Sequence, residues 1–182
     1  MSILVISENS NSELKSSTLN TISAASNIGE DIEVIVFGNK CDPVVEIVSK
    51  IKKVKKILYL DNLQFDNPIA ENITPVIVSL ADKYSHILAP ASTFGKNIMP
   101  RVAALLDLSQ ISDVIKIESS DTFVRPIYAG NAFATVKSND SKKCVTIRPT
   151  SFDPAPTSGG SAEIVKADGA EASTLTKFIK RE

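Results

Sequence analysis

Residues 85–97 read Ser-His-Ile-Leu-Ala-Pro-Ala-Ser-Thr-Phe-Gly-Lys-Asn, and this stretch decides the fold. Its first part, Ser85–Ala89, has the apolar composition of a strand that is buried on both faces. A short turn follows, and then a helix whose apolar side chains recur at steps of three and four residues: Ile98, Met99, Val102, Ala103 and Leu106. A buried strand that leads through a turn into an amphipathic helix is the repeating unit of α/β proteins.

The same unit occurs three times before this stretch. The predicted strands are Ser2–Ser7, Ile32–Gly38 and Lys56–Leu60. Ser10-x-x-Glu13 fits a capping box that opens the first helix, and Asp42-Pro43 opens the second, which runs to about Ile51. The third helix contains Pro75, so either a kink or a start at Thr74-Pro75 is expected. This alternation predicts a mostly parallel sheet with helices on both faces.

The pattern changes after Asp107. Four strands without intervening helices are predicted over residues 111–117, 122–128, 132–137 and 143–148, and we interpret them as antiparallel edge strands or hairpins. Residues 149–171 have the Pro, Gly and Ser content of a linker, and residues 173–182 have the pattern of a short helix. The sequence therefore predicts an α/β domain over 1–148 and, over 149–182, a linker that approaches a further domain.

Composition excludes several classes of protein. The 182 residues are 43% hydrophobic and 23% charged, with a formal net charge of −1, which argues against a dedicated nucleic-acid binder. The apolar runs are too short to span a bilayer, and the N-terminus lacks the features of a secretory signal. Two distant cysteines exclude a disulfide scaffold and favour a reducing compartment.

Catalytic and cofactor motifs are mostly missing from the sequence. There is no Walker motif or Gly-x-Gly-x-x-Gly, and the turn after the first strand lacks glycine and contains Glu8, which would repel a phosphate. His86 is the only histidine and lies at the start of a strand, so we interpret it as structural. One histidine and two distant cysteines do not suffice for a zinc site.

One turn remains as a candidate anion site. Its members are Ser92, Thr93, Gly95, Lys96 and Asn97, which combine hydroxyl groups, helix N-terminal N–H groups and a cation. The alternative is structural: Ser92 or Asn97 caps the helix and Gly95 permits a tight turn. The pattern alone leaves both interpretations open.

Several longer motifs carry a resemblance to a known family. They are Phe94-Gly95-Lys96-Asn97, Pro100-Arg101-Val102-Ala103-Ala104, Ile111-Ser112-Asp113-Val114, Phe123–Ala132, Ile147–Phe152 and Thr157-Ser158-Gly159-Gly160. Together they resemble the alpha subunits of the electron transfer flavoproteins, and the similarity covers nearly the whole chain.

The resemblance implies a three-layer, nucleotide-hydrolase-like (Rossmann-like) fold within a heterodimer. The family carries electrons from flavin dehydrogenases, notably acyl-CoA dehydrogenases, to a quinone oxidoreductase. FAD lies mostly in the C-terminal domain of the alpha subunit, and AMP is expected only in the beta subunit. The flavin-contacting segment of the family has no counterpart here, so no flavin-binding residue is carried over and the chain alone is not expected to bind FAD.

The resulting hypothesis is a scaffold domain that packs against the beta subunit and has no catalytic residues of its own. Candidate interface or framework residues are Arg101, Arg125, Tyr128 and Arg148. The alternatives are a stand-alone adenine-nucleotide-binding module that uses residues 92–97, and a small hydrolase of related fold. The expected location is a bacterial cytoplasm, or the mitochondrial matrix in a eukaryote, with no insertion into a membrane.

Overall fold

The computed structural model describes residues 2–169 and 171–180. The α-helices are α1 (Ser16–Ala25), α2 (Asp42–Ser49), α3 (Ala70–Leu80) and α4 (Thr93–Leu105). The strands are β1 (Ile3–Ile6), β2 (Ile32–Gly38), β3 (Val54–Asp61), β4 (His86–Pro90), β5 (Gln110–Val114), β6 (Lys116–Ile117), β7 (Thr122–Ile127), β8 (Ala132–Lys137), β9 (Lys143–Ile147) and β10 (Glu163–Lys166). Short 3-10 turns lie at η1 (Leu63–Phe65), η2 (Ala81–Lys83), η3 (Tyr128–Gly130) and η4 (Pro149–Ser151).

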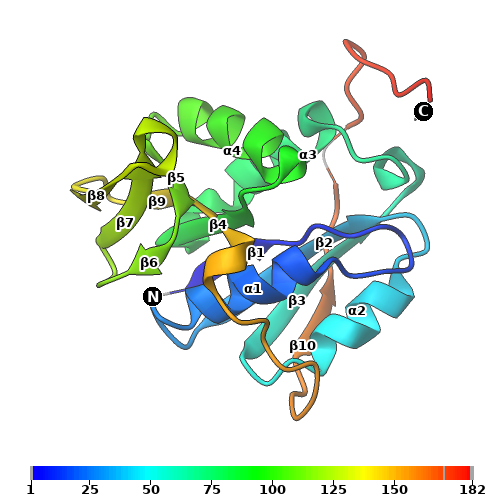
Figure 1. Ribbon diagram of the computed structural model, residues 1–182. Coiled ribbons are helices and arrows are strands. Elements are labelled where there is room, and N and C mark those ends of the chain that lie inside the picture. The colour runs from blue at the N-terminus through cyan, green and yellow to red at the C-terminus, as the bar shows by residue number, and fades with distance from the viewer. Residues whose placement is uncertain (1, 170, 181–182) are drawn as a thin grey trace.

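The main sheet has seven strands in the order β10-β3-β2-β1-β4-β9-β5, and every pair in it is parallel. The chain passes from β1 outward to β2 and β3, and then returns to the other side of β1 to form β4 (Figure 1). The connections that leave the carboxyl ends of β1 and β4 therefore diverge. In open α/β sheets such a divergence is where ligands bind.

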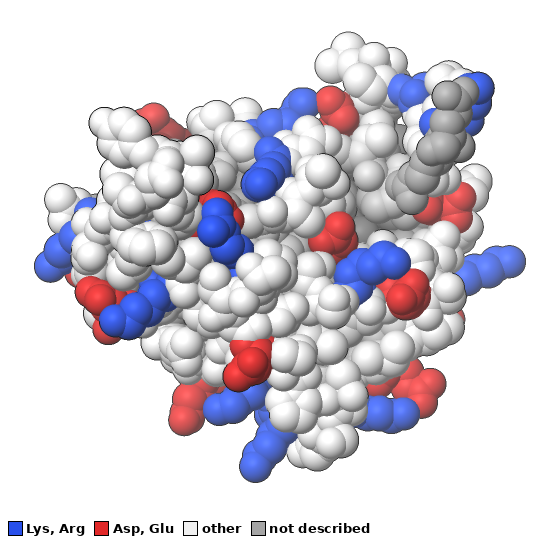
Figure 2. Space-filling view, viewed as in Figure 1, with Lys and Arg blue, Asp and Glu red and all other residues white. Residues whose placement is uncertain are grey.

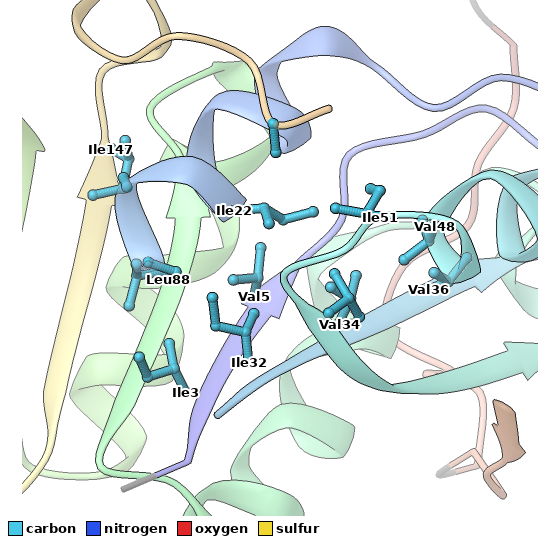
Figure 3. Close-up of a cluster of buried hydrophobic side chains, with 14 of the residues drawn as sticks. Ile3, Val5, Ile22, Ile32, Val34, Val36, Val48, Ile51, Leu88 and Ile147 are labelled. Carbon is cyan, nitrogen blue, oxygen red and sulfur yellow. The ribbon is translucent and has the colours of Figure 1, made fainter. Parts of the chain in front are cut away.

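Helices cover both faces of this sheet, which confirms the predicted three-layer α/β fold. One buried cluster joins α1 and α2 to side chains such as Ile3, Val5 and Val34, which project from one face (Figure 3). A second cluster joins α3 and α4 to Leu4 and Ile35 on the other face. Neighbouring residues of β1 thus belong to opposite clusters, as the period of two in a strand requires.

The antiparallel strands differ from the prediction in their position. They are not edge strands of the main sheet, because β6, β7 and β8 form a sheet of their own (Figure 1). In contrast, β5 and β9 join the main sheet in parallel. The physical reason is that the β6–β8 sheet acts as the crossover: it returns the chain to the amino end of the sheet, so β9 enters between β4 and β5 in the common direction.

One predicted helix start is wrong, and for another helix the structure decides between two alternatives. Ser10 and Glu13 do not open α1. Instead they close a local turn, in which the Glu13 amide donates to Ser10 Oγ at 3.0 Å, and α1 begins only at Ser16. α3 begins at Ala70 and continues through Pro75, which lies on its exposed face, so the alternative start at Thr74-Pro75 is the one that is wrong.

Part of the predicted linker is packed on the domain. β10 pairs with β3 in parallel, and the Gly160 amide donates to the Lys50 carbonyl at 2.8 Å. The Ala155 amide donates to the Leu19 carbonyl at 3.1 Å. The helix predicted over residues 173–182 is absent from its described part, 173–180, where the Ser173 amide donates to Asn72 Oδ1 on α3 at 2.8 Å. The division of the chain at residue 148 stays a prediction.

Candidate functional site

A crevice of about 630 Å³ lies at the switch point between β1 and β4. Three segments that follow the carboxyl ends of strands line it: the loop after β1, the loop after β3 and the start of α4. The lining residues are Glu8, Asn9, Ser10, Asn11, Lys15, Asp66, Asn67, Pro68, Thr93, Phe94 and Asn97. Its position is the one at which α/β folds of this kind bind ligands.

Side-chain hydrogen bonds hold the loops of the crevice. Asn9 Nδ2 donates to the Phe37 carbonyl at 3.0 Å, which ties the loop after β1 to β2. Asn11 Nδ2 donates to Asp66 Oδ1 at 2.7 Å, which joins this loop to the loop after β3. Glu8 Oε2 accepts a hydrogen bond from Ser17 Oγ at 2.8 Å, so this carboxylate is oriented by α1. The walls of the crevice are therefore fixed by asparagine amides and carboxylates.

This lining does not suit a phosphate or pyrophosphate group. Glu8 and Asp66 both contribute carboxylates. Among the described residues that line the crevice, Lys15 is the one cation, and its Nζ lies 3.0 Å from Glu13 Oε2. Phosphate-binding turns place free backbone N–H groups, usually from glycine, beside the anion. A dinucleotide such as FAD, which carries a pyrophosphate, therefore does not fit the residues present at this crevice.

The start of α4 does not bring the five predicted anion-site residues together. Ser92 caps the helix, because its Oγ accepts a hydrogen bond from the Gly95 amide at 3.3 Å. Gly95 packs against the backbone of Pro90. Thr93 and Asn97 line the crevice, whereas Lys96 is not among the described residues that line it. The arrangement favours the structural interpretation of the turn, and the anion site stays a prediction.

A second cluster of functional groups lies on the other flank of α4. Asp113 sits in a bulge of β5, where three steps along β5 match two steps along β9. Its φ of 60° is in the left-handed region, which is uncommon for a residue other than glycine. Its amide donates to Oγ1 of the buried Thr146 at 2.9 Å. The bulge directs the carboxylate towards Arg148, which follows β9.

Arg148 binds this carboxylate with both sides of its guanidinium group. Nε donates to Oδ1 of Asp113 at 3.0 Å, and a terminal nitrogen of Arg148 donates to Oδ2. The Arg148 hydrogen bonds hold the pKa of Asp113 below its usual range, and the positive charges of Lys96 and Arg125 lower it further. Arg125 is fixed separately, because its Nε donates to the Ser112 carbonyl at 2.9 Å. The Asp113 carboxylate is thus paired with Arg148 and also feels the positive charges of Lys96 and Arg125.

The other two interface or framework candidates lie apart from this cluster. Arg101 joins α4 to α3, since its terminal nitrogen lies 2.8 Å from Glu71 Oε1. Tyr128 is 80% exposed at the tip of the β7–β8 hairpin. Its φ of 49° and that of Ala129, 53°, are both left-handed. Arg101, Arg125 and Arg148 therefore make contacts within the domain, whereas Tyr128 presents its ring to solvent.

His86, which we interpreted as a structural histidine, is buried. Its Nδ1 lies 2.8 Å from Ser85 Oγ and its Nε2 lies 2.6 Å from the Ser120 carbonyl, so both ring nitrogens have partners. Burial lowers the pKa of this imidazole. Cys41 and Cys144 are free and buried, and burial raises the pKa of their thiols to about 11 and about 12. None of these groups is positioned to attack a substrate at the surface.

Within residues 2–169 and 171–180, no group of three or more His, Cys, Asp or Glu side chains could hold a metal ion. No helix there combines the length and apolar character needed to cross a membrane.

Sequence reasoning named Arg125 and Arg148 as framework candidates, but it missed the partner of Arg148, Asp113, and the crevice residues Asn11 and Asp66. The hydrogen-bonded residues Asn11 and Asp66 are 55 positions apart in the sequence, and Asp113 and Arg148 are 35 positions apart. Asp113 carried little local signal, because its strand Gln110–Val114 also contains the polar residues Gln110 and Ser112. Nothing in the sequence near Asp66 distinguishes it from other loop acids.

Comparison with known proteins identifies the family. The family model described as "Electron transfer flavoprotein domain" matches residues 3–172. The chain belongs to the electron transfer flavoprotein family. It is 50% identical to the mitochondrial electron transfer flavoprotein subunit alpha of Dictyostelium discoideum, over 97% of this chain and 52% of that protein. It is 47% identical to the alpha subunit of Pseudomonas aeruginosa and 42% identical to that of Paracoccus denitrificans, in each case over 100% of this chain and 59% of the relative.

The chain therefore spans between half and three fifths of the length of these relatives. The relatives are named as alpha subunits and include mitochondrial and bacterial proteins. The resemblance noted from the sequence motifs is confirmed at the level of the family.

Proposed function

We propose that this chain is the N-terminal domain of an electron transfer flavoprotein alpha subunit and that its task is structural. In this role it packs against the beta subunit and supports a heterodimer that carries electrons. The observation that carries the proposal is the similarity to alpha subunits along the whole of this chain. We propose that the heterodimer takes electrons from flavin dehydrogenases, among them acyl-CoA dehydrogenases, and passes them to a quinone oxidoreductase.

The proposal assigns no electron-transfer step to the residues of this chain. Flavin chemistry belongs to the cofactor, and the protein contributes binding and orientation. The carboxylates of Glu8 and Asp66 at the switch-point crevice disfavour the pyrophosphate of FAD there. We therefore expect the chain alone to bind no FAD. The corresponding location is the bacterial cytoplasm, or the mitochondrial matrix if the source is a eukaryote.

The experiment that tests the proposal is co-expression with the beta subunit of the same organism. Size-exclusion chromatography should give a one-to-one complex, while the isolated chain, after incubation with FAD and removal of the excess, should show no flavin absorbance. Failure of the two chains to associate would overturn the scaffold role. Flavin retained at one per chain would overturn the expectation that FAD is held elsewhere.

A second candidate function is a stand-alone adenine-nucleotide-binding module, and the crevice at the switch point is the observation that favours it. Its acidic lining opposes a nucleotide phosphate, so we rank this function lower. Thermal melting with AMP or ATP separates the two functions. A ligand present at one hundred times its dissociation constant stabilises the folded state by about 2.7 kcal/mol, whereas the scaffold should show no shift.

A further inference from the structure

The cluster around Asp113 is built from four separate elements. Asp113 comes from β5, Arg125 from β7, Arg148 from the residue after β9, and Lys96 from the first turns of α4. Arg148 and Asp113 pair through two hydrogen bonds, which neutralise one positive and one negative charge. Arg125 is held next to this pair, because its Nε donates to the carbonyl of Ser112 at 2.9 Å, and the positive charge of Lys96 also acts on Asp113. The N-terminal end of α4 adds a partial positive charge of its own.

The backbone at this cluster is irregular. A bulge in β5 and a left-handed φ of 60° both occur at Asp113, whose carboxylate pairs with Arg148. Bulges commonly redirect a side chain next to a functional site, and a non-glycine residue in the left-handed region costs free energy that the fold must offset. The result is an arginine whose guanidinium plane is fixed in position beside two further cations.

The cluster is open to solvent. The Arg148 side chain is 38% exposed and Lys96 is exposed. Lys96 has no ion pair in the part of the chain that the structure describes. Over the face seen in Figure 2, acidic and basic side chains are interspersed without a broad region of one charge. The chain as a whole has a net charge of −1, so an excess of positive charge at this place is a local feature.

We propose that Lys96, Arg125 and Arg148 form a docking site for a carboxylate, and that the carboxylate is an Asp or Glu side chain of the partner subunit. Asp113 is the positioning residue that holds Arg148 for this contact. A carboxylate suits a planar guanidinium group because both oxygens can accept parallel hydrogen bonds. Charge complementarity of this kind mainly raises the rate and specificity of association.

This inference rests on the proposed function, because the partner is the beta subunit. The affinity and the association rate of the beta subunit for the full chain are measured by biolayer interferometry, at low and at physiological salt. The test variant is Lys96→Glu, which removes no hydrogen bond or ion pair of the folded chain that the structure describes. The matched control is Lys52→Glu, since Lys52 is equally exposed but lies between α2 and β3, at the amino end of the sheet.

We expect Lys96→Glu to slow association and weaken binding by about tenfold at low salt, with a smaller loss at high salt. Arg125→Gln should act in the same direction with a smaller effect, and Lys52→Glu should stay within about twofold of the wild type. Circular dichroism and thermal melting verify that each variant is folded.

Three results would overturn the inference. If the wild type binds the beta subunit and Lys96→Glu binds equally well, the docking site is wrong and the proposed function stands. If Lys96→Glu and Lys52→Glu weaken binding equally, the effect is one of net charge and no local site exists. If the wild type does not bind the beta subunit at all, the proposed function and the docking site both fail.

Discussion

A Cβ atom built on Gly95 would lie 1.9 Å from the carbonyl oxygen of Pro90, so the first turn of α4 is in direct backbone contact with the end of β4. No side chain fits between these two segments, and Gly95 is buried. The close approach fixes the angle at which α4 leaves the sheet. It therefore also positions Thr93 and Asn97 at the crevice.

Replacement of Gly95 by alanine should lower the free energy of unfolding by about 1–3 kcal/mol, the usual cost of overpacking. In an unstrained helix the same change would raise stability by about 1 kcal/mol, so the sign of the effect tests the contact. The measurement is urea denaturation at neutral pH. Gly29→Ala is the matched control, because the nearest atom to its new Cβ is Ile3 Cδ1 at an ordinary 3.6 Å. Equal effects at both positions would contradict the prediction.

The Asp113–Arg148 pair should make stability depend on acid pH. Pairing lowers the pKa of Asp113 in the folded state. The contribution of the pair to the free energy of unfolding is therefore complete above the pKa of the unfolded state, about 3.9, and is lost as the pH falls through the pKa of the folded state. The pair is partly exposed, so we expect Asp113→Asn to cost about 0.5–1 kcal/mol at pH 7. The difference from wild type should shrink as the pH falls well below 4, measured by denaturant titration at each pH.

Asp107→Asn is the control for this change. Asp107 also has a left-handed backbone, with φ of 53°, and it is exposed. Asparagine tolerates this conformation as aspartate does, so both variants leave the backbone unstrained relative to wild type. A loss of stability at pH 7 that is equal in the two variants would show that the ion pair contributes nothing.

His86 should make the free energy of unfolding depend on pH near neutrality as well. Burial lowers its folded-state pKa below the unfolded value of about 6.5, so between these two values the unfolded chain binds the extra proton. Stability should therefore rise as pH increases through this interval and become flat above it. Because His86 is the only histidine, this slope should disappear in His86→Gln. The midpoint of urea unfolding between pH 5 and pH 7.5 is the measurement, and an unchanged slope in the variant would assign it to other groups.

Residues 149–169 should be needed for a stable domain. They contribute β10 to the edge of the sheet and donate backbone hydrogen bonds to α1 and to the end of α2. A chain of residues 1–148 should unfold at a lower temperature and aggregate through the exposed edge of β3. A chain of residues 1–169 keeps these contacts and should melt close to the full chain. If residues 1–148 melted as the full chain does, the segment would be a true linker.

The sequence was sufficient to predict the helices and strands that have a strong local pattern of apolar residues. Strands that are buried on both faces, such as β2 and β4, appear as continuous apolar runs, and α4 has an apolar face. β10 has no such signal, because only one of its four residues is even partly buried and its stability comes from pairing with β3. A strand held by its neighbour rather than by its own side chains cannot be identified from the local pattern.

The predicted site residues were separated by the fold for a related reason. Ser92, Thr93, Gly95, Lys96 and Asn97 are adjacent in sequence, but a helix turns successive side chains by about 100°. Thr93 and Asn97 therefore line the crevice, while Lys96 is not among its described lining residues and its positive charge acts on Asp113. Contacts such as Asp113 with Arg148 depend on strand order, which no local sequence feature specifies.

The position of β10 also has a consequence for biosynthesis. The ribosome makes β3 early, yet the strand that pairs with its outer edge is completed only when Lys166 has been added, more than a hundred residues later. Until then the nascent chain carries an unpaired, parallel sheet edge. Translation pauses or premature termination between these two strands would leave that edge available to other nascent chains and to chaperones.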